Sequence, residues 1–333
     1  MNLAGSLFAN VPPVASRPVD VPALVQSARE GSPRAVARLI SLVEDEHPAL
    51  REVMAALAPH AGNAHVIGIT GSPGVGKSTS TNALVAAYRK RGQRIGILAV
   101  DPSSPFSGGA LLGDRVRMQD HALDPEVYIR SMASRGHLGG LSWTTPQALR
   151  VLDAAGCDIV LVETVGVGQS EVEVAGLADT TVVLLAPGMG DGIQAAKAGI
   201  LEIGDVFVVN KADREGADAT VRDLRHMISL GDRTEPGLWR PPVVKTVAAR
   251  NEGIEEVIEA IDKHADWLAR TGHLRERREA RAGDEIEAIV LAALRRRMGN
   301  LRHHDSVDRL AADVVDGRTD PYAAADQVLD ALT

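Results

Sequence analysis

A glycine-rich run in the first third of the chain has the residue types of a phosphate-binding loop. Residues 71–78 read GSPGVGKS and lie between an apolar stretch and a helix-like one. Glycines allow consecutive backbone N–H groups to curl around a β-phosphate, and the following helix adds partial positive charge at its N-terminus. Lys77 would supply a mobile cation for the β- and γ-oxygens, and Ser78 would offer its hydroxyl to Mg²⁺. Every fixed position of the pattern is filled, so the run predicts a nucleoside triphosphate site rather than an ordinary glycine-rich turn.

A second motif, Asn210-Lys211-Ala212-Asp213, closes an apolar run and predicts that the base is guanine. The Asp213 carboxylate can accept hydrogen bonds from guanine N1–H and from the exocyclic amine. Adenine offers no such pair and would leave the carboxylate unpaired. Asn210 would hold the loop and the base edge, while the stem of Lys211 would cover the ring. Downstream lies the place where GTPases use a Ser-Ala pair to offer a backbone N–H to guanine O6. The serine is missing, but a backbone donor does not need it, and the candidates are Val247, Ala248 and Ala249.

Acidic residues end two further apolar runs and are candidates for the metal and the attacking water. In DIVLVETVGVG, Glu163 stands where most GTPases place Asp, and its carboxylate would lie near Mg²⁺ while the Gly166 N–H would meet the γ-phosphate. Val167 occupies the place where Ras-like proteins carry the water-positioning glutamine, so intrinsic hydrolysis is expected to be slow. Asp101 ends the run RIGILAVD, where an acid can reach the metal or orient the water.

The long segment after Asp101, PSSPFSGGALLGDRVRM, is rich in Gly and Ser and is interpreted as a switch that γ-phosphate and Mg²⁺ would order. Its Arg115 and Arg117 fit either such a switch or a solvated helix end, and the sequence leaves both open. His137 belongs to a His-x-x-Gly pattern that is part of a cobalamin-ligating signature. Position 135 is Arg where that signature needs Asp to orient the imidazole, so we expect a glycine-rich turn and no cobalt ligation.

The elements that must position these residues alternate between short apolar runs and helical stretches. Apolar on both faces, the runs predict strands of a doubly wound, mostly parallel α/β sheet. The expected strands are 65–70, 94–100, 158–163, 180–186, 206–210 and 241–247, with 126–132 as a further candidate. The expected helices between them are 77–91, 146–155, 192–203 and 217–229.

Helical segments flank this core on both sides and define three expected regions. Residues 1–60 comprise an aperiodic, Pro-containing arm followed by two or three short helices, 61–265 form the nucleotide-binding domain, and 266–333 form a helical extension. The extension is expected as one long helix over 274–298 and a pair over 305–315 and 320–332. Its apolar surface exceeds what a lone appendage needs, which indicates packing on the core or on another subunit.

Composition excludes several classes of protein. The net charge of −8 gives no general affinity for nucleic acid, and one cysteine in 333 residues excludes an internal disulfide framework and a multi-cysteine metal cluster. No stretch approaches the roughly 20 apolar residues that span a membrane, and the N-terminal residues lack the pattern of a signal peptide. We therefore expect a soluble, cytoplasmic protein with no nucleic-acid or membrane partner.

Five segments of the chain resemble the GTPases that carry Glu in place of Asp in their third guanine-nucleotide motif. In chain order they are GSPGVGKST, VDPSSPFSGGALLGDRVRM, ETVGVGQSE, GMGDGIQAAKAGILEI and NKAD. Within them the chain resembles the MeaB, or methylmalonic aciduria type A, group, once labelled ArgK or LAO/AO transport ATPase, over about residues 20–300. The resemblance implies a homodimeric P-loop GTPase of the SIMIBI class. It also implies a chaperone that loads, protects and reactivates adenosylcobalamin-dependent methylmalonyl-CoA mutase, and a dimerising role for the C-terminal helices.

Carried over by position, the resemblance also implies roles for individual residues. GTP or GDP would be contacted by Gly71, Ser72, Pro73, Gly74, Val75, Gly76, Lys77, Ser78 and Thr79, and by Asn210 to Asp213. Metal-linked roles would fall to Ser78, Asp101, Asp114 and Glu163, and the catalytic set would be Lys77, Asp101, Glu163 and Gly166. Residues 188–197 resemble a third switch, which makes Asp191, Gln194 and Lys197 candidates for signalling to the mutase.

Three other functions compete with this reading. A nickel-insertion GTPase would need Cys or His clusters, which a single Cys and scattered His do not supply. A kinase or transport ATPase conflicts with Asp213, and nucleotide preference would decide the matter. A scaffold that binds nucleotide without turnover conflicts with the intact Lys77, Ser78, Asp101 and Glu163.

Overall fold

The computed structural model describes residues 19–101, 121, 123–133, 144–164, 170–188, 200–230, 237–298 and 305–330. The chain divides into two compact units, residues 1–271 and 272–333. The first unit holds the sheet and all the described candidate site residues, so its construction decides the geometry of the site.

Seven strands form one sheet in the described part of the chain, and every strand pair is parallel. Their spatial order is β3-β2-β4-β1-β5-β6-β7, which places β1 in the middle and carries the chain outward in both directions. The strands are β1 His65–Thr70, β2 Ile95–Asp101, β3 Val127–Ala133, β4 Ile159–Thr164, β5 Thr180–Leu185, β6 Val206–Val209 and β7 Val243–Lys245. This confirms the predicted doubly wound sheet, including the further strand expected at 126–132.

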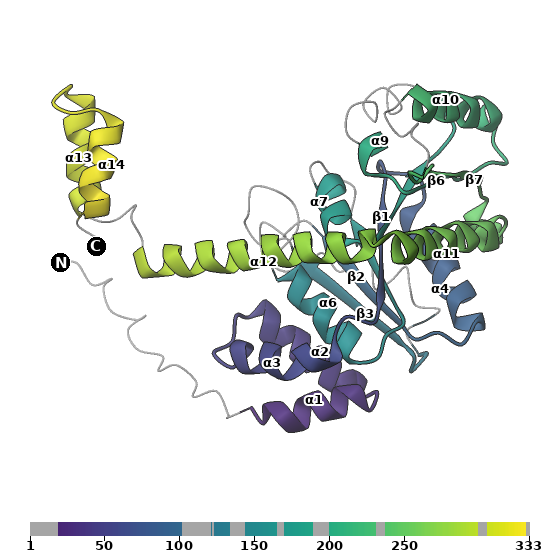
Figure 1. Cartoon of the computed structure of the whole chain (residues 1–333), viewed down its shortest axis with the longest axis horizontal. Coiled ribbons are helices and arrows are strands. Elements are labelled where there is room, and N and C mark those ends of the chain that lie inside the picture. Colours follow the sequence, from purple (N-terminus) through teal and green to yellow (C-terminus); the bar gives the residue numbers. More distant parts are fainter. Residues whose placement is uncertain are drawn as a thin grey trace, which may run out of the picture. The chain divides into compact units, whose positions relative to one another are not determined.

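Helices cover both faces of the sheet because alternate residues of each buried strand point to opposite sides (Figure 1). Ile67 and Ile69 of β1 pack with helices α4 Lys77–Lys90 and α11 Ile254–Thr271 in one apolar cluster. Val66, from the same strand, belongs to a second cluster with α6 Thr145–Ala154 and the N-terminal helices. A third, smaller cluster joins β5 and β6 to α10 Ala217–Leu230.

Gly68 of β1 permits a close approach between the sheet and helix α7 Ser170–Leu177. A Cβ at this position would lie 2.4 Å from Cγ1 of Val174, a distance that real side chains do not tolerate. The glycine therefore brings α7 directly against the central strand that leads into the phosphate loop.

Three short helices precede the sheet: α1 Val21–Arg29, α2 Pro33–Glu44 and α3 Leu50–Leu57. The first two begin at residues with side-chain oxygens, since Asp20 accepts from the Ala23 N–H and Ser32 accepts from the Ala35 N–H. A 3₁₀ turn, η1 Ala58–His60, leads into β1. The expectation of two or three packed helices before the sheet is confirmed.

Most helices between the strands begin and end within two residues of their predicted limits. The expected helix 192–203 is described only at its end, as α9 Ile200–Ile203, because residues 189–199 lie outside the described residues. After β7 the chain forms a single turn, η3 Ala248–Arg250, before α11.

The second unit consists of three described helices: α12 His273–Met298, α13 Asp305–Val315 and α14 Pro321–Asp330. Leu310 of α13 and Ala324 of α14 are buried, and the two helices contact each other. Helix α12 instead exposes apolar side chains at helical spacing, namely Ile286, Ile289, Val290 and Leu294. In the described part of the chain, no helix combines the length and the apolar character needed to cross a membrane.

Candidate nucleotide-binding site

The predicted phosphate loop connects the end of β1 to the first residue of α4, in the strand–loop–helix setting that its pattern requires. Gly71, Gly74 and Gly76 all have positive φ, at 138°, 81° and 96°. At Gly71 a Cβ would lie 2.2 Å from the Leu184 carbonyl oxygen, so no other residue fits. The loop thus curls over the carboxyl ends of the central strands.

Lys77, the first residue of α4, is 8% exposed, and its ammonium turns back over the loop. It donates to the Gly71 carbonyl at 2.6 Å and to the Ser72 carbonyl at 3.4 Å. The ammonium is therefore held inside the curve of the loop, where a phosphate oxygen would compete with these carbonyls for it.

Ser78 and Glu163, two of the residues with predicted metal-linked roles, lie in direct contact. The Ser78 hydroxyl donates to Oε1 of Glu163 at 2.8 Å, and Glu163 is 2% exposed. Parallel pairing of β1 with β4 sets Glu163 opposite Ile69, two residues before the phosphate loop begins at Gly71. A buried carboxylate beside a hydroxyl offers hard oxygen ligands, which is the donor chemistry that Mg²⁺ prefers.

Asp101 is the last residue of β2, and β2 lies next to β4 in the sheet. In the parallel register Val100 lies opposite Thr164, so the backbone of Asp101 reaches the same edge of the sheet as Glu163. Within the described residues no group of three or more His, Cys, Asp or Glu could hold a metal ion by itself. A Mg²⁺ ion at this edge would depend on nucleotide oxygens as well as on protein ligands.

Asn210 follows β6 and forms a hydrogen-bonded hub between three loops. Its side-chain amide donates to the Val75 carbonyl of the phosphate loop at 2.8 Å. Its Oδ1 accepts from the Thr246 hydroxyl at 3.1 Å and from the Ala248 N–H at 3.0 Å. Asn210 is 3% exposed, so these bonds are shielded from water. A Cβ on Gly76 would lie 2.5 Å from this amide, which explains the third glycine of the loop.

The next residue, Lys211, has φ of 57° and reaches back to the phosphate loop. Its ammonium donates to the Gly74 carbonyl at 2.5 Å, so its stem spans the space between the two predicted motifs. Asp213 is 41% exposed in its side chain and forms an ion pair at 3.5 Å with Arg250. The two motifs that the sequence predicts for phosphate and base are thus directly linked.

Residues 247–249 lie beside this hub at the entry to η3. The Val247 N–H donates to the Glu252 carbonyl, and the Ala248 N–H donates to Asn210. Ala249 is left as the member of the trio whose N–H makes no hydrogen bond to a described residue. It is the most available of the three candidate donors for guanine O6.

Several predicted residues fall outside the description. Gly166, Asp114, Asp191, Gln194 and Lys197, together with Arg115, Arg117 and His137, lie outside the described residues. Of Asp101 only the backbone is described.

Three residues of the site were missed by reasoning from the sequence: Thr246, Arg250 and Glu252. Thr246 is 2% exposed and completes the Asn210 hub, and Glu252 binds Arg250 at 2.9 Å. Their position in the sequence could have identified them, because Thr246 directly precedes the Val-Ala-Ala trio, and Arg250 and Glu252 follow it. Their contacts nevertheless depend on β6 and β7 being neighbours, which the sequence indicates only through the order of strands.

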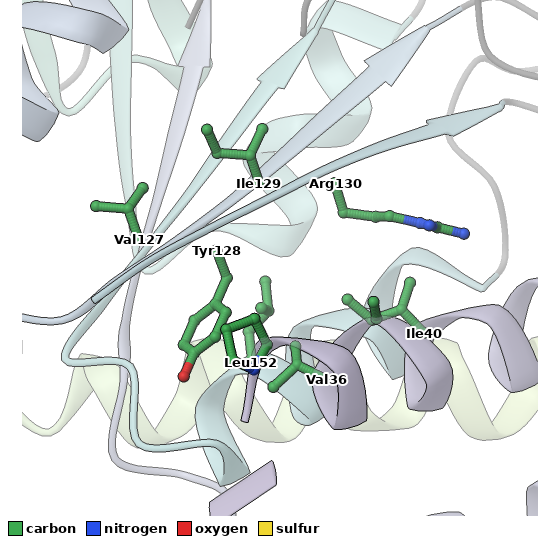
Figure 2. Close-up of a pocket in the computed structure, with 9 residues that line it drawn as sticks. Val36, Ile40, Val127, Tyr128, Ile129, Arg130 and Leu152 are labelled. Atoms are coloured by element: carbon green, nitrogen blue, oxygen red, sulfur yellow. The ribbon is translucent and has the colours of Figure 1, made fainter. Parts of the chain in front are cut away.

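A separate cavity of about 340 Å³ lies along the edge strand β3 and is lined by residues of β3, of helix α2 and of helix α6. Figure 2 shows Tyr128 extending from β3 toward Val36 and Leu152. The walls are mainly apolar, and the polar Arg130 donates to the Glu44 carboxylate. None of the predicted nucleotide or metal residues lines this cavity.

The fold and the loop geometry define a P-loop nucleotide-binding protein whose second motif is that of guanine recognition. Comparison with known proteins narrows the class. The family model described as "Methylmalonyl Co-A mutase-associated GTPase MeaB" matches residues 36–302. The chain belongs to this family of GTPases.

Individual relatives agree with the family. A Pyrococcus abyssi protein named as a GTPase is 48% identical over 307 residues, which cover 92% of this chain and 95% of the relative. A Caenorhabditis elegans protein named methylmalonic aciduria type A homolog, mitochondrial, is 35% identical over 78% of this chain and 69% of its own length. The crystal structure of a LAO/AO transport system kinase has a TM-score of 0.70 and 27% identity, covering 93% of this chain and 96% of that one. The resemblance read from the sequence and the SIMIBI-type P-loop fold are confirmed.

Proposed function

We propose that this chain is a GTP-driven chaperone for an adenosylcobalamin-dependent methylmalonyl-CoA mutase, acting in cofactor loading, protection and reactivation. The family description supplies the partner, since it names GTPases associated with that mutase. The observation that carries the proposal is the hub at Asn210, which joins the phosphate loop to the predicted guanine motif. A protein built this way can convert the state of its nucleotide into a change of shape.

The proposed guanine contacts follow from this hub. Asp213 would accept from N1–H and the exocyclic amine, the Lys211 stem would cover one face of the base, and a backbone N–H of the 247–249 trio would meet O6. Changing Asp213 to Asn should erode the preference for GTP over xanthosine triphosphate. Undiminished discrimination would show that guanine is read elsewhere.

The proposed phosphate and metal contacts use the described loop. Backbone N–H groups of residues 71–79 and the Lys77 ammonium would bind the phosphates, while Ser78, Glu163, Asp101 and Asp114 would hold Mg²⁺ directly or through water. The Ser78–Glu163 contact supports this assignment because it gathers two oxygen ligands at one point. Bound Mg²⁺ would neutralise charge that develops on the phosphate oxygens. Lys77→Ala should abolish tight GTP binding, and unchanged affinity would refute the assignment of the loop.

We further propose that intrinsic turnover is slow and that the client enzyme accelerates it. Val167 offers no amide to orient the attacking water, so a client that supplies such a group would complete the site. Asp191, Gln194 and Lys197 are the proposed signalling residues of the third switch, residues 188–197.

A homodimer formed through the helices of residues 266–333 completes the proposal. Helix α12 exposes Ile286, Ile289, Val290 and Leu294, and exposed apolar side chains at helical spacing favour an interface between subunits. Ile289→Glu combined with Leu294→Glu should convert a dimer to a monomer in light scattering. Glu287→Ala on the same helix is the matched control and should leave the mass unchanged.

The decisive experiment measures GTP hydrolysis with and without purified methylmalonyl-CoA mutase, with ATP as the control nucleotide. Slow GTP turnover that accelerates markedly with the mutase would support the chaperone. If the mutase does not change the rate of GTP hydrolysis, the chain is still a GTPase but its client is another enzyme. Faster hydrolysis of ATP than of GTP would favour a kinase or transport ATPase.

A further inference from the structure

The predicted guanine-reading carboxylate has a partner on a different loop. Arg250 ends the η3 turn, and its guanidinium lies 3.5 Å from Oδ2 of Asp213. The two residues are 37 positions apart in the sequence, so the contact is tertiary. Both side chains are about half exposed, at 53% and 41%. At such exposure an ion pair contributes little to stability, so a role in stability does not explain the contact.

Arg250 is itself held in place from its other side. Its Nε donates to Oε1 of Glu252 at 2.9 Å, and Nη2 donates to Oε2 at 3.4 Å, which is the two-pronged geometry of Arg with a carboxylate. The guanidinium therefore lies between two carboxylates, hydrogen-bonded to one and ion-paired with the other. Of the two, only Asp213 belongs to the predicted guanine motif.

The backbone that carries Arg250 and Glu252 is a closed turn. Val247 and Glu252 form an antiparallel bridge, and Asn251 takes φ of 57° to reverse the chain. Gly253 closes the turn, because a Cβ there would lie 2.2 Å from the Lys245 carbonyl oxygen. The Ala248 N–H fixes this same turn to Asn210. The guanidinium is thus positioned from the hub that also positions the loop of Asp213.

A carboxylate that reads guanine must present both oxygens in the plane of the base, one to N1–H and one to the exocyclic amine. An exposed Asp side chain rotates about two torsions, and freezing them on binding opposes affinity. A guanidinium fixed beside Oδ2 restricts that rotation before the base arrives. The carboxylate retains lone pairs for both donors of guanine, since each of its oxygens can accept more than one hydrogen bond.

We propose that Arg250, anchored by Glu252, is a positioning residue for guanine specificity that holds the Asp213 carboxylate in the plane of the base. The inference rests on the proposed reading of guanine by Asp213 and adds to it the group that orients the carboxylate. The orienting contact comes from the turn residues that directly follow the 247–249 trio.

The test compares the affinities of GDP and inosine diphosphate, which lacks the exocyclic amine, by calorimetry with the full chain. Arg250→Ala should lower the GDP to inosine diphosphate affinity ratio by about tenfold, the weight of one well-placed charge-assisted hydrogen bond. Glu252→Gln, which loosens the anchor and keeps the Arg, should lower it less. Arg214→Ala, one residue from Asp213, removes the same charge from a side chain with no ion pair to a described residue and should leave the ratio unchanged.

The ratio of GDP to inosine diphosphate affinity distinguishes the positioning role of Arg250 from the reading of guanine by Asp213. Asp213→Asn should lower the ratio at least as far as Arg250→Ala, and the two changes together should add nothing further. A lowered ratio in Asp213→Asn with a wild-type ratio in Arg250→Ala would overturn the positioning role alone. An equal weakening of both nucleotides in Arg250→Ala would also overturn it. A wild-type ratio in Asp213→Asn would overturn both the inference and the proposed guanine reading.

Discussion

Replacing Asn210 by alanine should show how strongly the site depends on one side chain. The substitution deletes the donor to the Val75 carbonyl and the acceptor shared by the Thr246 hydroxyl and the Ala248 N–H. These three groups belong to residues that are 0%, 2% and 3% exposed. Each would lose a hydrogen bond in a place that bulk water does not reach.

The magnitude follows from the number of bonds lost. A buried hydrogen bond contributes about 1 kcal/mol net to the free energy of unfolding, and a buried polar group left without a partner lowers that free energy by about 1–3 kcal/mol. Three such groups therefore lower the free energy of unfolding of Asn210→Ala by at least about 3 kcal/mol, which is a large fraction of the stability of a typical domain. GDP affinity should fall as well, because the loop that cradles the phosphates loses its anchor.

Urea unfolding measures the first effect and calorimetry the second. The transition midpoint should fall for Asn210→Ala while its slope stays constant, since the surface exposed on unfolding is little changed. Thr246→Val is the matched control: it keeps the shape of the side chain and deletes one of the three bonds, so it should lose about 1 kcal/mol. A loss of stability in Asn210→Ala no greater than that in Thr246→Val, or GDP affinity equal to that of wild type, would refute the central role of Asn210.

Three further predictions concern the buried residues Cys157, Gly71 and His264. Burial raises the pKa of the Cys157 thiol, so iodoacetamide at pH 8.5 should modify the native protein far more slowly than the urea-unfolded one. Equal rates of modification would contradict the burial of the thiol. Because the pKa of this thiol is higher in the folded protein than in the unfolded chain, its protonated form stabilises the fold fully below the usual pKa of about 8.5, and that stabilisation declines as the pH rises above this value. Gly71→Ala should lower the melting temperature and abolish GDP binding, since its Cβ would meet the Leu184 carbonyl at 2.2 Å, whereas Gly74→Ala, with open space around its Cβ, should be milder in calorimetry. His264→Ala should lose about 3 kcal/mol in urea unfolding, because the fully buried ring bonds Thr180 at 2.8 Å and packs on Trp239 and Trp267. GDP affinity should survive that change, since Thr180 begins its strand at the end remote from the phosphate loop; a matched loss of affinity would contradict this.

The sheet could be predicted from the sequence because its strands are apolar on both faces. A run such as DIVLVE is too short for a helix and too apolar for a loop, so only a buried strand accommodates it. The limits of the strands follow less directly from the sequence. The last strand is predicted over 241–247 but spans only Val243–Lys245. Two prolines stand at its start, and they lack the N–H groups that a ladder requires.

The site could be predicted where a contiguous motif carries the chemistry and not where tertiary contacts do. GSPGVGKS and NKAD each contain their own donors and acceptors, so their roles follow from residue type and spacing. Arg250 matters because β7 lies beside β6 and returns the chain to Asp213. No local pattern encodes that return, and the same holds for Thr246 at the hub.

The motifs predicted to bind the base and the phosphates form one hydrogen-bonded unit rather than two separate ones. Asn210 and Lys211 each donate to a carbonyl of the phosphate loop, at Val75 and Gly74. The turn that carries Arg250 is also bonded to Asn210, through the Ala248 N–H. We therefore expect a base that fits poorly against Asp213 to strain the predicted phosphate loop, because the two motifs share these hydrogen bonds. We expect the wrong base to weaken phosphate binding as well as base binding, which lets a single carboxylate discriminate more strongly than its own hydrogen bonds would allow.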